Sequence, residues 1–144
     1  MRATRRIPAG LPKLILPLAA LAAGCSAAAT ERPVPPTAER NLHFLGLIYH
    51  QVSSRNGHAP ASTEELKPML RRFGYPEGIL VSPNDGQPYT FCWGVQVFQP
   101  RAAGAYPVLA YESTGVGGRK YVVDAMLVVK QMSDDELQQA LRVK

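Results

Sequence analysis

A short apolar segment near the N-terminus most constrains this chain, because it decides how many residues are left to form a folded core. The segment covers residues 11–23 and follows a basic start that contains three arginines. A membrane-spanning helix needs roughly 20 apolar residues, whereas this segment is shorter and is interrupted by Pro12, Lys13 and Pro17. The pattern is typical of an export signal. We therefore predict that residues 1–24 are removed and that the rest of the 144-residue chain holds one domain.

The apolar segment ends in the sequence Leu-Ala-Ala-Gly-Cys at residues 21–25. This sequence resembles the lipobox of bacterial lipoproteins, in which the cysteine thiol is acylated and the peptide bond before it is cut. The resemblance implies cleavage between Gly24 and Cys25, acyl chains such as palmitate on Cys25, and a protein that is anchored in the cell envelope and faces the periplasm. Ser26, rather than Asp, follows the cysteine, which in lipoproteins favours the outer membrane over the inner one.

A proline-rich stretch separates this cysteine from the domain. Residues 26–37 contain three prolines and lack apolar periodicity, which predicts a partly extended linker. The lipidated cysteine and the tether together cover residues 25–37, and the predicted domain covers residues 38–144.

Charge and cysteine content narrow the classes of partner. The formal net charge is +5, but four of the 16 basic residues precede Cys25, which leaves 12 against 11 acidic residues. Such a balance gives no support to a nucleic-acid partner, which needs clustered basic residues. With Cys25 acylated, Cys92 has no disulfide partner in the chain, and its neighbours Phe91 and Trp93 predict a buried, inert thiol.

The first helix is predicted over residues 38–56, with Gly57 as its left-handed stop. Its apolar side is formed by Leu42, Leu45, Ile48, Tyr49 and Val52, with Phe44 at the edge. His43 and His50 fall on the polar side, roughly 10 Å apart along the helix, which is too far to share one metal ion. We interpret both as solvated side chains that belong to a candidate interaction face.

A second, short helix begins after Ser62. Ser62 and Glu65 have the spacing of a capping box, and Pro68 predicts a kink or a break beyond the first turn. Lys67, Arg71 and Arg72 form a small basic face on this helix. Two interpretations of this basic face are open. The three side chains are either simply solvated, or they belong with His43 and His50 to the candidate interaction face and contact an acidic partner.

Strand patterns follow in the second half of the chain. Residues 84–86 read Asn-Asp-Gly and predict a tight turn. Residues 89–97 form the clearest strand pattern, because large apolar side chains alternate with smaller or polar ones. Further strands are predicted at residues 108–111 and within residues 121–129, where Asp124-Ala125 either divides the segment into two short strands or marks a bulge.

A last helix is predicted to begin at Ser133, which forms a second capping box with Glu136, and to bury Leu137 and Leu141. The elements therefore run helix, short helix, antiparallel strands, helix. This order predicts an α+β domain in which the first two helices pack on a small antiparallel sheet and a C-terminal helix closes the domain. All helices are expected on one face of that sheet.

The first helix and the segment after it also resemble pilin-like proteins, the type II secretion pseudopilins. One subgroup has an Asn-Leu-x-x-x-Gly-Leu-x-x-His helix followed by Asn-Gly-x-x-Pro, which Asn41, Leu42, Gly46, Leu47, His50, Asn56, Gly57 and Pro60 match. Residues 108–112 and 121–137 are similar to its closing β-meander. The resemblance implies a pilin-head-like fold. This chain departs from the pseudopilin pattern in two ways. Residues 1–37 stand in place of the long apolar helix that builds filaments, so we do not expect a filament. Ala125 stands where the subgroup usually has glycine.

Three functions are compatible with these patterns. The first is a lipid-anchored accessory or interaction module, linked to a secretion or pilin-like system. The second is a periplasmic lipoprotein that binds a small ligand on the aromatic strand 89–97. The third is a hydrolase, which would need a nucleophile, a base and an orienting group in contact. No catalytic residues, cofactor site or metal site is predicted, and the interaction module is our leading hypothesis.

Overall fold

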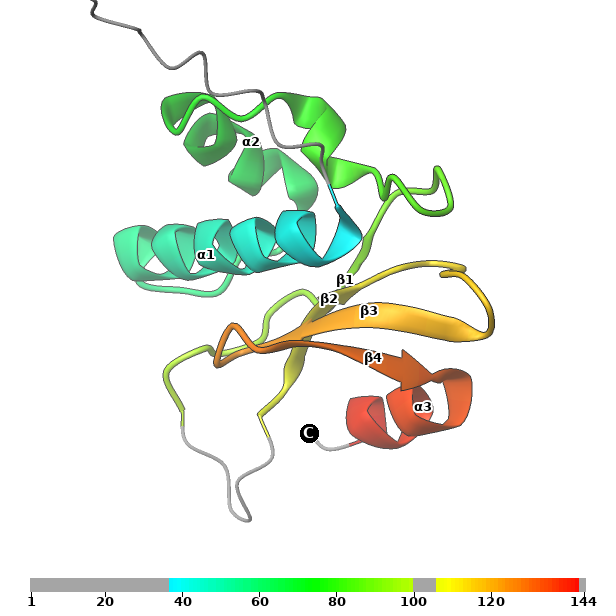
Figure 1. The fold of residues 1–144 in the computed structure, drawn as a ribbon. Coiled ribbons are helices and arrows are strands. Elements are labelled where there is room, and N and C mark those ends of the chain that lie inside the picture. The colour runs from blue at the N-terminus through cyan, green and yellow to red at the C-terminus, as the bar shows by residue number, and fades with distance from the viewer. Residues whose placement is uncertain (1–36, 100–105, 143–144) are drawn as a thin grey trace, which may run out of the picture. The chain divides into compact units, whose positions relative to one another are not determined.

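The computed structural model describes residues 37–99 and 106–142. The predicted signal, the lipidation site Cys25 and the tether before Thr37 lie outside these residues. The described chain is an α+β fold whose four strands form an antiparallel sheet in the order β1-β2-β3-β4 (Figure 1). The elements are α1 (Ala38–Asn56), α2 (Thr63–Arg72), the 3-10 helix η1 (Glu77–Leu80), β1 (Thr90–Phe91), β2 (Val108–Tyr111), β3 (Arg119–Asp124), β4 (Val129–Ser133) and α3 (Asp134–Arg142).

Helix α1 has the predicted limits and the predicted buried side. Its first turn is capped by Thr37, whose hydroxyl accepts a hydrogen bond from the Arg40 amide at 3.2 Å. Gly57 ends the helix with φ 73°, a left-handed conformation that favours glycine. The five apolar residues expected on one side are all buried, so helical periodicity alone located this part of the core.

Gly46 allows α1 to lie directly on the sheet. A Cβ atom at this position would stand 2.9 Å from Cδ2 of Leu127 and 3.1 Å from Cγ2 of Val123. The helix backbone therefore approaches β3 and the β3–β4 turn more closely than any larger residue would permit. Glycine weakens a helix interior by roughly 1 kcal/mol relative to alanine, and the close approach is the physical reason for its presence.

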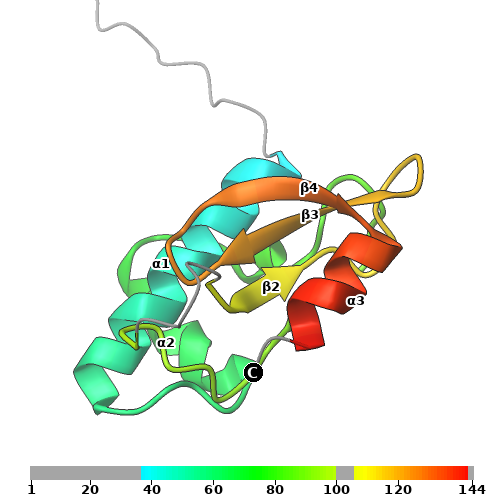
Figure 2. The same cartoon turned by 90° about the horizontal axis from the view of Figure 1, so that it is seen from below.

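The expectation that all helices share one face of the sheet is wrong, because α3 lies on the face opposite α1. Figure 1 shows α1 above the sheet and α3 below it, and Figure 2 views the sheet from below. Val123 belongs to the core under α1, whereas Val122 packs with Val108 and Leu137 of α3. Both valines are fully buried, and such consecutive apolar residues are typical of a strand covered on both faces.

The capping box of α3 is confirmed. The Glu136 amide donates to Oγ of Ser133 at 3.3 Å, and the Ser133 amide donates to Oε2 of Glu136 at 2.7 Å. The corresponding prediction for α2 is only partly correct. Ser62 is the N-cap residue but forms no side-chain cap bond, and Oε1 of Glu65 accepts from the Ala61 amide instead.

The predicted kink or break at Pro68 is not observed as an interruption of α2, which continues from Thr63 to Arg72. Proline removes one backbone hydrogen bond from a helix. The buried stripe of Leu66, Met69 and Leu70 holds the helix against α1 and compensates for this loss.

The long strand predicted at residues 89–97 is also wrong, because only Thr90–Phe91 pairs with β2. Gly94 has φ 76° and turns the chain away from the sheet. The Tyr49 hydroxyl accepts from the Val95 amide at 3.0 Å and donates to the Cys92 carbonyl at 3.1 Å, which fixes the irregular segment to α1. The alternation in the sequence therefore does not mark a strand, since Tyr89 and Val97 are buried but Trp93 between them is exposed.

Glu112 holds two loops together from a fully buried position that sequence patterns did not single out. Its Oε1 accepts hydrogen bonds from Oγ of Ser82 at 2.7 Å and from Nδ2 of Asn84 at 2.9 Å. Its Oε2 accepts from the Tyr121 amide at 2.8 Å. Because a buried carboxylate is tolerated only when its oxygens are bonded, this residue closes the loop before β1 onto β2 and β3.

We predict that Glu112→Ala lowers the free energy of unfolding by about 3 kcal/mol, because it leaves the buried Ser82 hydroxyl and the part-buried donors of Asn84 and Tyr121 without an acceptor. The matched control is Glu39→Ala, which removes an exposed carboxylate from the first turn of α1 and should cost less than about 1 kcal/mol. Both values are measured by urea unfolding. Equal costs for the two variants would contradict the structural role of Glu112.

Candidate functional site

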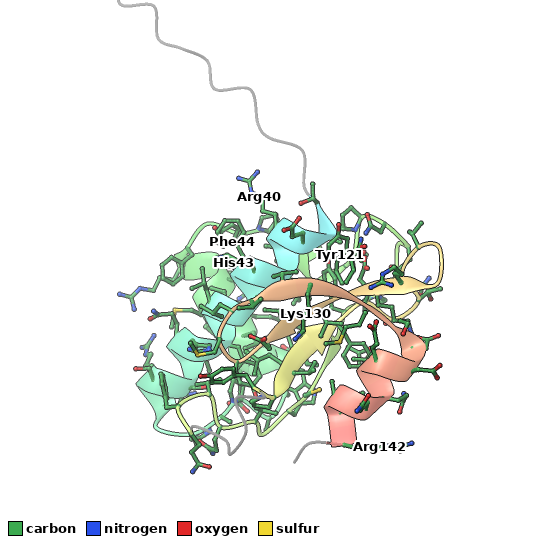
Figure 3. All side chains as sticks on the ribbon, turned by 60° about the horizontal axis from the view of Figure 1, so that its bottom comes forward. Arg40, His43, Phe44, Tyr121, Lys130 and Arg142 are labelled. Carbon is green, nitrogen blue, oxygen red and sulfur yellow. The ribbon has the colours of Figure 1, made fainter. Side chains whose placement is uncertain are left out.

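The two histidines of the candidate interaction face contact the turn between β3 and β4. Nε2 of His50 lies 2.9 Å from the Ala125 carbonyl oxygen, and Nδ1 of His43 lies 3.3 Å from the Leu127 carbonyl oxygen. A carbonyl oxygen only accepts, so each ring nitrogen is the donor. Both side chains therefore fasten the turn to α1, and Figure 3 shows His43 near the first turns of this helix.

The prediction that His50 is solvated is wrong. Its side chain is half-buried, and the Phe98 ring packs edge-on against it with ring centroids 5.6 Å apart. Burial lowers the pKa of His50 below its ordinary value of 6.5, and the hydrogen bond to Ala125 opposes this shift in part. His43 stays exposed, so of the two histidines only His43 is open to a partner.

The predicted basic face of α2 is largely neutralised by its own neighbours. Lys67 forms ion pairs with Glu64 and Glu77, and Arg71 contacts Glu77 at 2.8 Å. The hydrogen bond to Glu64 raises the pKa of Lys67, and the hydrogen bond from Arg71 lowers that of Glu77. Although exposed ion pairs contribute little to stability, they cancel the charge that would attract an acidic partner.

Arg72 differs from its two neighbours, because it lies beside Arg55 at the end of α1. An open hollow of about 490 Å³ separates the two helices there, and it is lined by Gln51, Ser54, Arg55, Met69, Arg72 and Phe73. The Phe73 side chain is 54% exposed at the rim. Sequence analysis missed Arg55, since nothing local relates the last turn of α1 to the last turn of α2.

The hollow has an uncompensated positive charge. Neither Arg55 nor Arg72 forms an ion pair with a carboxylate within residues 37–99 and 106–142. The two guanidinium groups stand at the C-terminal ends of helices, where the backbone carbonyls favour cations. Guanidinium groups can bind a carboxylate through two parallel hydrogen bonds, so the hollow is suited to a carboxylate-bearing ligand with an apolar neighbour for Phe73.

Other chemically competent groups are held in structural contacts. Ser82 bonds to Glu112 but is only 1% exposed, so a substrate cannot reach its hydroxyl. Nδ1 of His58 bonds to the Ala59 carbonyl. Cys92 is half-buried and burial raises the pKa of its thiol, which lowers its reactivity. In the part of the chain that the structure describes, no three His, Cys, Asp or Glu side chains gather to hold a metal ion.

Among the described helices, none is both long and apolar enough to cross a membrane. Comparison of the chain with protein-family models, curated proteins and solved structures found no match.

We predict that His50 makes the fold less stable in mild acid. Its lowered folded pKa means that the unfolded state binds a proton first, so stability is greatest above pH 6.5 and falls as the pH drops through the folded pKa. His50→Gln should reduce the loss of stability between about pH 7.5 and about pH 5 in urea unfolding. His58→Gln, at an exposed loop position, is the control and should leave that loss unchanged. A pH dependence that is identical in all three proteins would contradict this assignment.

Proposed function

We propose that this chain is a lipid-anchored protein of the bacterial envelope whose α+β head is an interaction module. In this proposal Cys25 carries the acyl chains, the head faces the periplasm from the outer membrane, and residues 26–37 connect the two. The support for the anchor is the lipobox-like sequence at residues 21–25 behind a basic, apolar start.

The single observation that carries the interaction role is the hollow between Arg55, Arg72 and Phe73. It combines two arginines that lack an ion-pair partner among the described residues with an exposed aromatic ring. Arginine and aromatic residues are enriched at sites that dominate protein binding. The partner we propose is a protein segment that presents carboxylates next to an apolar side chain.

The hollow and the tether lie at opposite ends of α1. Arg55 is in the last turn of this helix, whereas Thr37 caps its start. A rise of 1.5 Å per residue places them roughly 25 Å apart. A head that is tethered at Thr37 can therefore present the hollow to a protein partner without the lipid attachment blocking access.

We further propose that the partner belongs to a secretion or pilin-like assembly. The support is the resemblance of residues 41–60, and more weakly of residues 108–112 and 121–137, to the sequence pattern of pseudopilins. The apolar segment at residues 11–23 is shorter than a membrane-spanning helix and is interrupted by Pro12, Lys13 and Pro17, so we propose an accessory role rather than that of a filament subunit.

A second candidate function is ligand binding by the aromatic residues around Trp93. The rings of Trp93 and Phe91 stack with centroids 4.8 Å apart, and Trp93 also stacks on Tyr49 at 6.4 Å. Trp93 is 37% exposed, so part of its surface is open to a flat apolar ligand. Most of residues 89–97 do not form the predicted strand. The stacked rings are the observation that favours ligand binding as a second candidate function.

We predict that Arg55→Gln combined with Arg72→Gln removes the specific partner from in-cell crosslinks. The reason is the loss of both guanidinium groups at the hollow, and the measurement is quantitative mass spectrometry of partners captured from membranes. The matched control combines Lys67→Gln with Arg71→Gln, which removes the same charge from side chains already paired with Glu64 and Glu77. If both double variants lose the partner, or if neither does, the hollow is not the site at which the partner binds.

We also predict that Cys25→Ser abolishes acylation and releases the protein from the washed membrane fraction. Intact-mass measurement of the wild-type protein should show a chain that begins at Cys25 and carries acyl chains. A wild-type chain without this mass, or a Cys25→Ser variant with unchanged acylation, would refute the lipid anchor but would leave the interaction proposal open to the crosslinking test.

A further inference from the structure

A second, apolar groove lies at the start of α1 and is distinct from the arginine hollow. Its volume is about 430 Å³, and its walls include Phe44, Tyr75, Pro76, Ile79, Val81 and Pro83. The Phe44 and Tyr75 rings contact each other with centroids 4.9 Å apart, and the Arg40 guanidinium lies 5.8 Å from the centre of the Phe44 ring. Figure 3 shows Arg40 and Phe44 together at the end of α1 where the chain enters the domain.

Two features leave this groove open within the described chain. Val81 on its wall is 39% exposed, although most large apolar residues of α1 and η1 are buried. A Cβ atom added to Gly78, which also lines the groove, would meet no atom within 4 Å. Exposed apolar walls of this kind are stabilised when a second apolar segment covers them.

We propose that residues 33–36 of the same chain, Pro-Val-Pro-Pro, occupy this groove. Segments rich in proline adopt the extended polyproline II conformation and bind grooves lined by aromatic side chains, because little conformational entropy is lost. The groove supplies the rings of Phe44 and Tyr75 together with two prolines, and the segment supplies three prolines and one valine.

The position of the segment in the chain fits this occupant. Thr37 is the N-cap of α1 in an extended conformation (φ −120°, ψ 151°), so Pro36 is the residue just outside the helix. The fourth helical residue, Asn41, lines the groove, so the groove begins within the first turns of the helix that follow Pro36 in the sequence.

The length of the segment fits as well. Four residues in the polyproline II conformation span roughly 12 Å. Thr37 and Phe44 are separated by roughly 10 Å along the helix axis. A segment that runs back from Thr37 would therefore reach the Phe44 ring without stretching and would end near the wall of the groove.

Covalent attachment makes even a weak contact effective. A segment held next to its site has a local concentration in the millimolar range, so a low intrinsic affinity is sufficient for occupancy. Docking would cover the apolar walls, shorten the free part of the tether to the residues before Pro33, and set the direction in which the head leaves its attachment point.

The test compares two engineered disulfides in the full-length chain, purified in detergent with Cys25→Ser and Cys92→Ser so that only introduced thiols remain. One protein carries Val34→Cys with Val81→Cys on the groove wall. The other carries Val34→Cys with Glu39→Cys, an exposed position that does not line the groove. The effective molarity of each thiol pair is measured in glutathione buffers. Pro83→Cys serves as a second wall position if Val81→Cys disturbs η1.

The two states of the tether predict opposite results. In an undocked tether the shorter loop between positions 34 and 39 closes more readily. In a docked tether the effective molarity of the thiol pair at positions 34 and 81 should exceed that of the pair at positions 34 and 39 by about tenfold. Gly78→Trp, which fills the groove, should reverse this order. Two results would overturn the proposal. One is a higher effective molarity for the 34–39 pair than for the 34–81 pair with the native groove. The other is a higher effective molarity for the 34–81 pair that persists in the Gly78→Trp variant.

Discussion

The packing of α1 against the sheet is the contact on which the rest of the described structure depends. Leu42, Leu45 and Tyr49 are fully buried at this contact. Gly46 makes the contact close, because its missing side chain lets the helix reach Val123 and Leu127. The same helix supports α2 on its other flank. One long element thus organises both layers above the sheet, and each of the two surface hollows that we relate to function lies near one of its ends.

Polar groups in this fold mainly hold irregular segments in place. Glu112 joins the loop before β1 to β2 and β3, and the Tyr49 hydroxyl fixes the turn around Gly94. Burial raises the pKa of Tyr49 to about 12, so this hydroxyl stays protonated and can always donate to Cys92. Asp124 accepts from two amides of the β3–β4 turn, where Leu127 takes a left-handed conformation (φ 63°). These groups are engaged in the fold, which leaves the surface as the place for function.

The two surfaces suit different tasks because their chemistry differs. The groove is apolar and lies at the start of α1, which follows the proline-rich segment in the sequence, so an intramolecular contact there would have the advantage of high local concentration. The hollow at the end of α1 carries two arginines and is far from that attachment, so it is open to a separate chain. A docked tether would orient the helix and thereby direct the distal hollow toward partners. In that case α1 would act as a rigid spacer between anchor and partner.

The sequence by itself determined the limits of α1, its buried stripe, the position of β2 and the capping box of α3. All of these follow from local periodicity and cap chemistry, which act within a few residues. The export signal and Cys25 remain predictions of the sequence. Only the tertiary structure decided the burial of His50 and Glu112, the two-residue length of β1 and the position of α3. It also decided that Lys67 and Arg71 are paired, whereas Arg72 forms no ion pair with a carboxylate of the described residues. Each of these depends on which distant segments meet, and the solvation or neutralisation of a polar side chain follows from such contacts rather than from its neighbours in sequence.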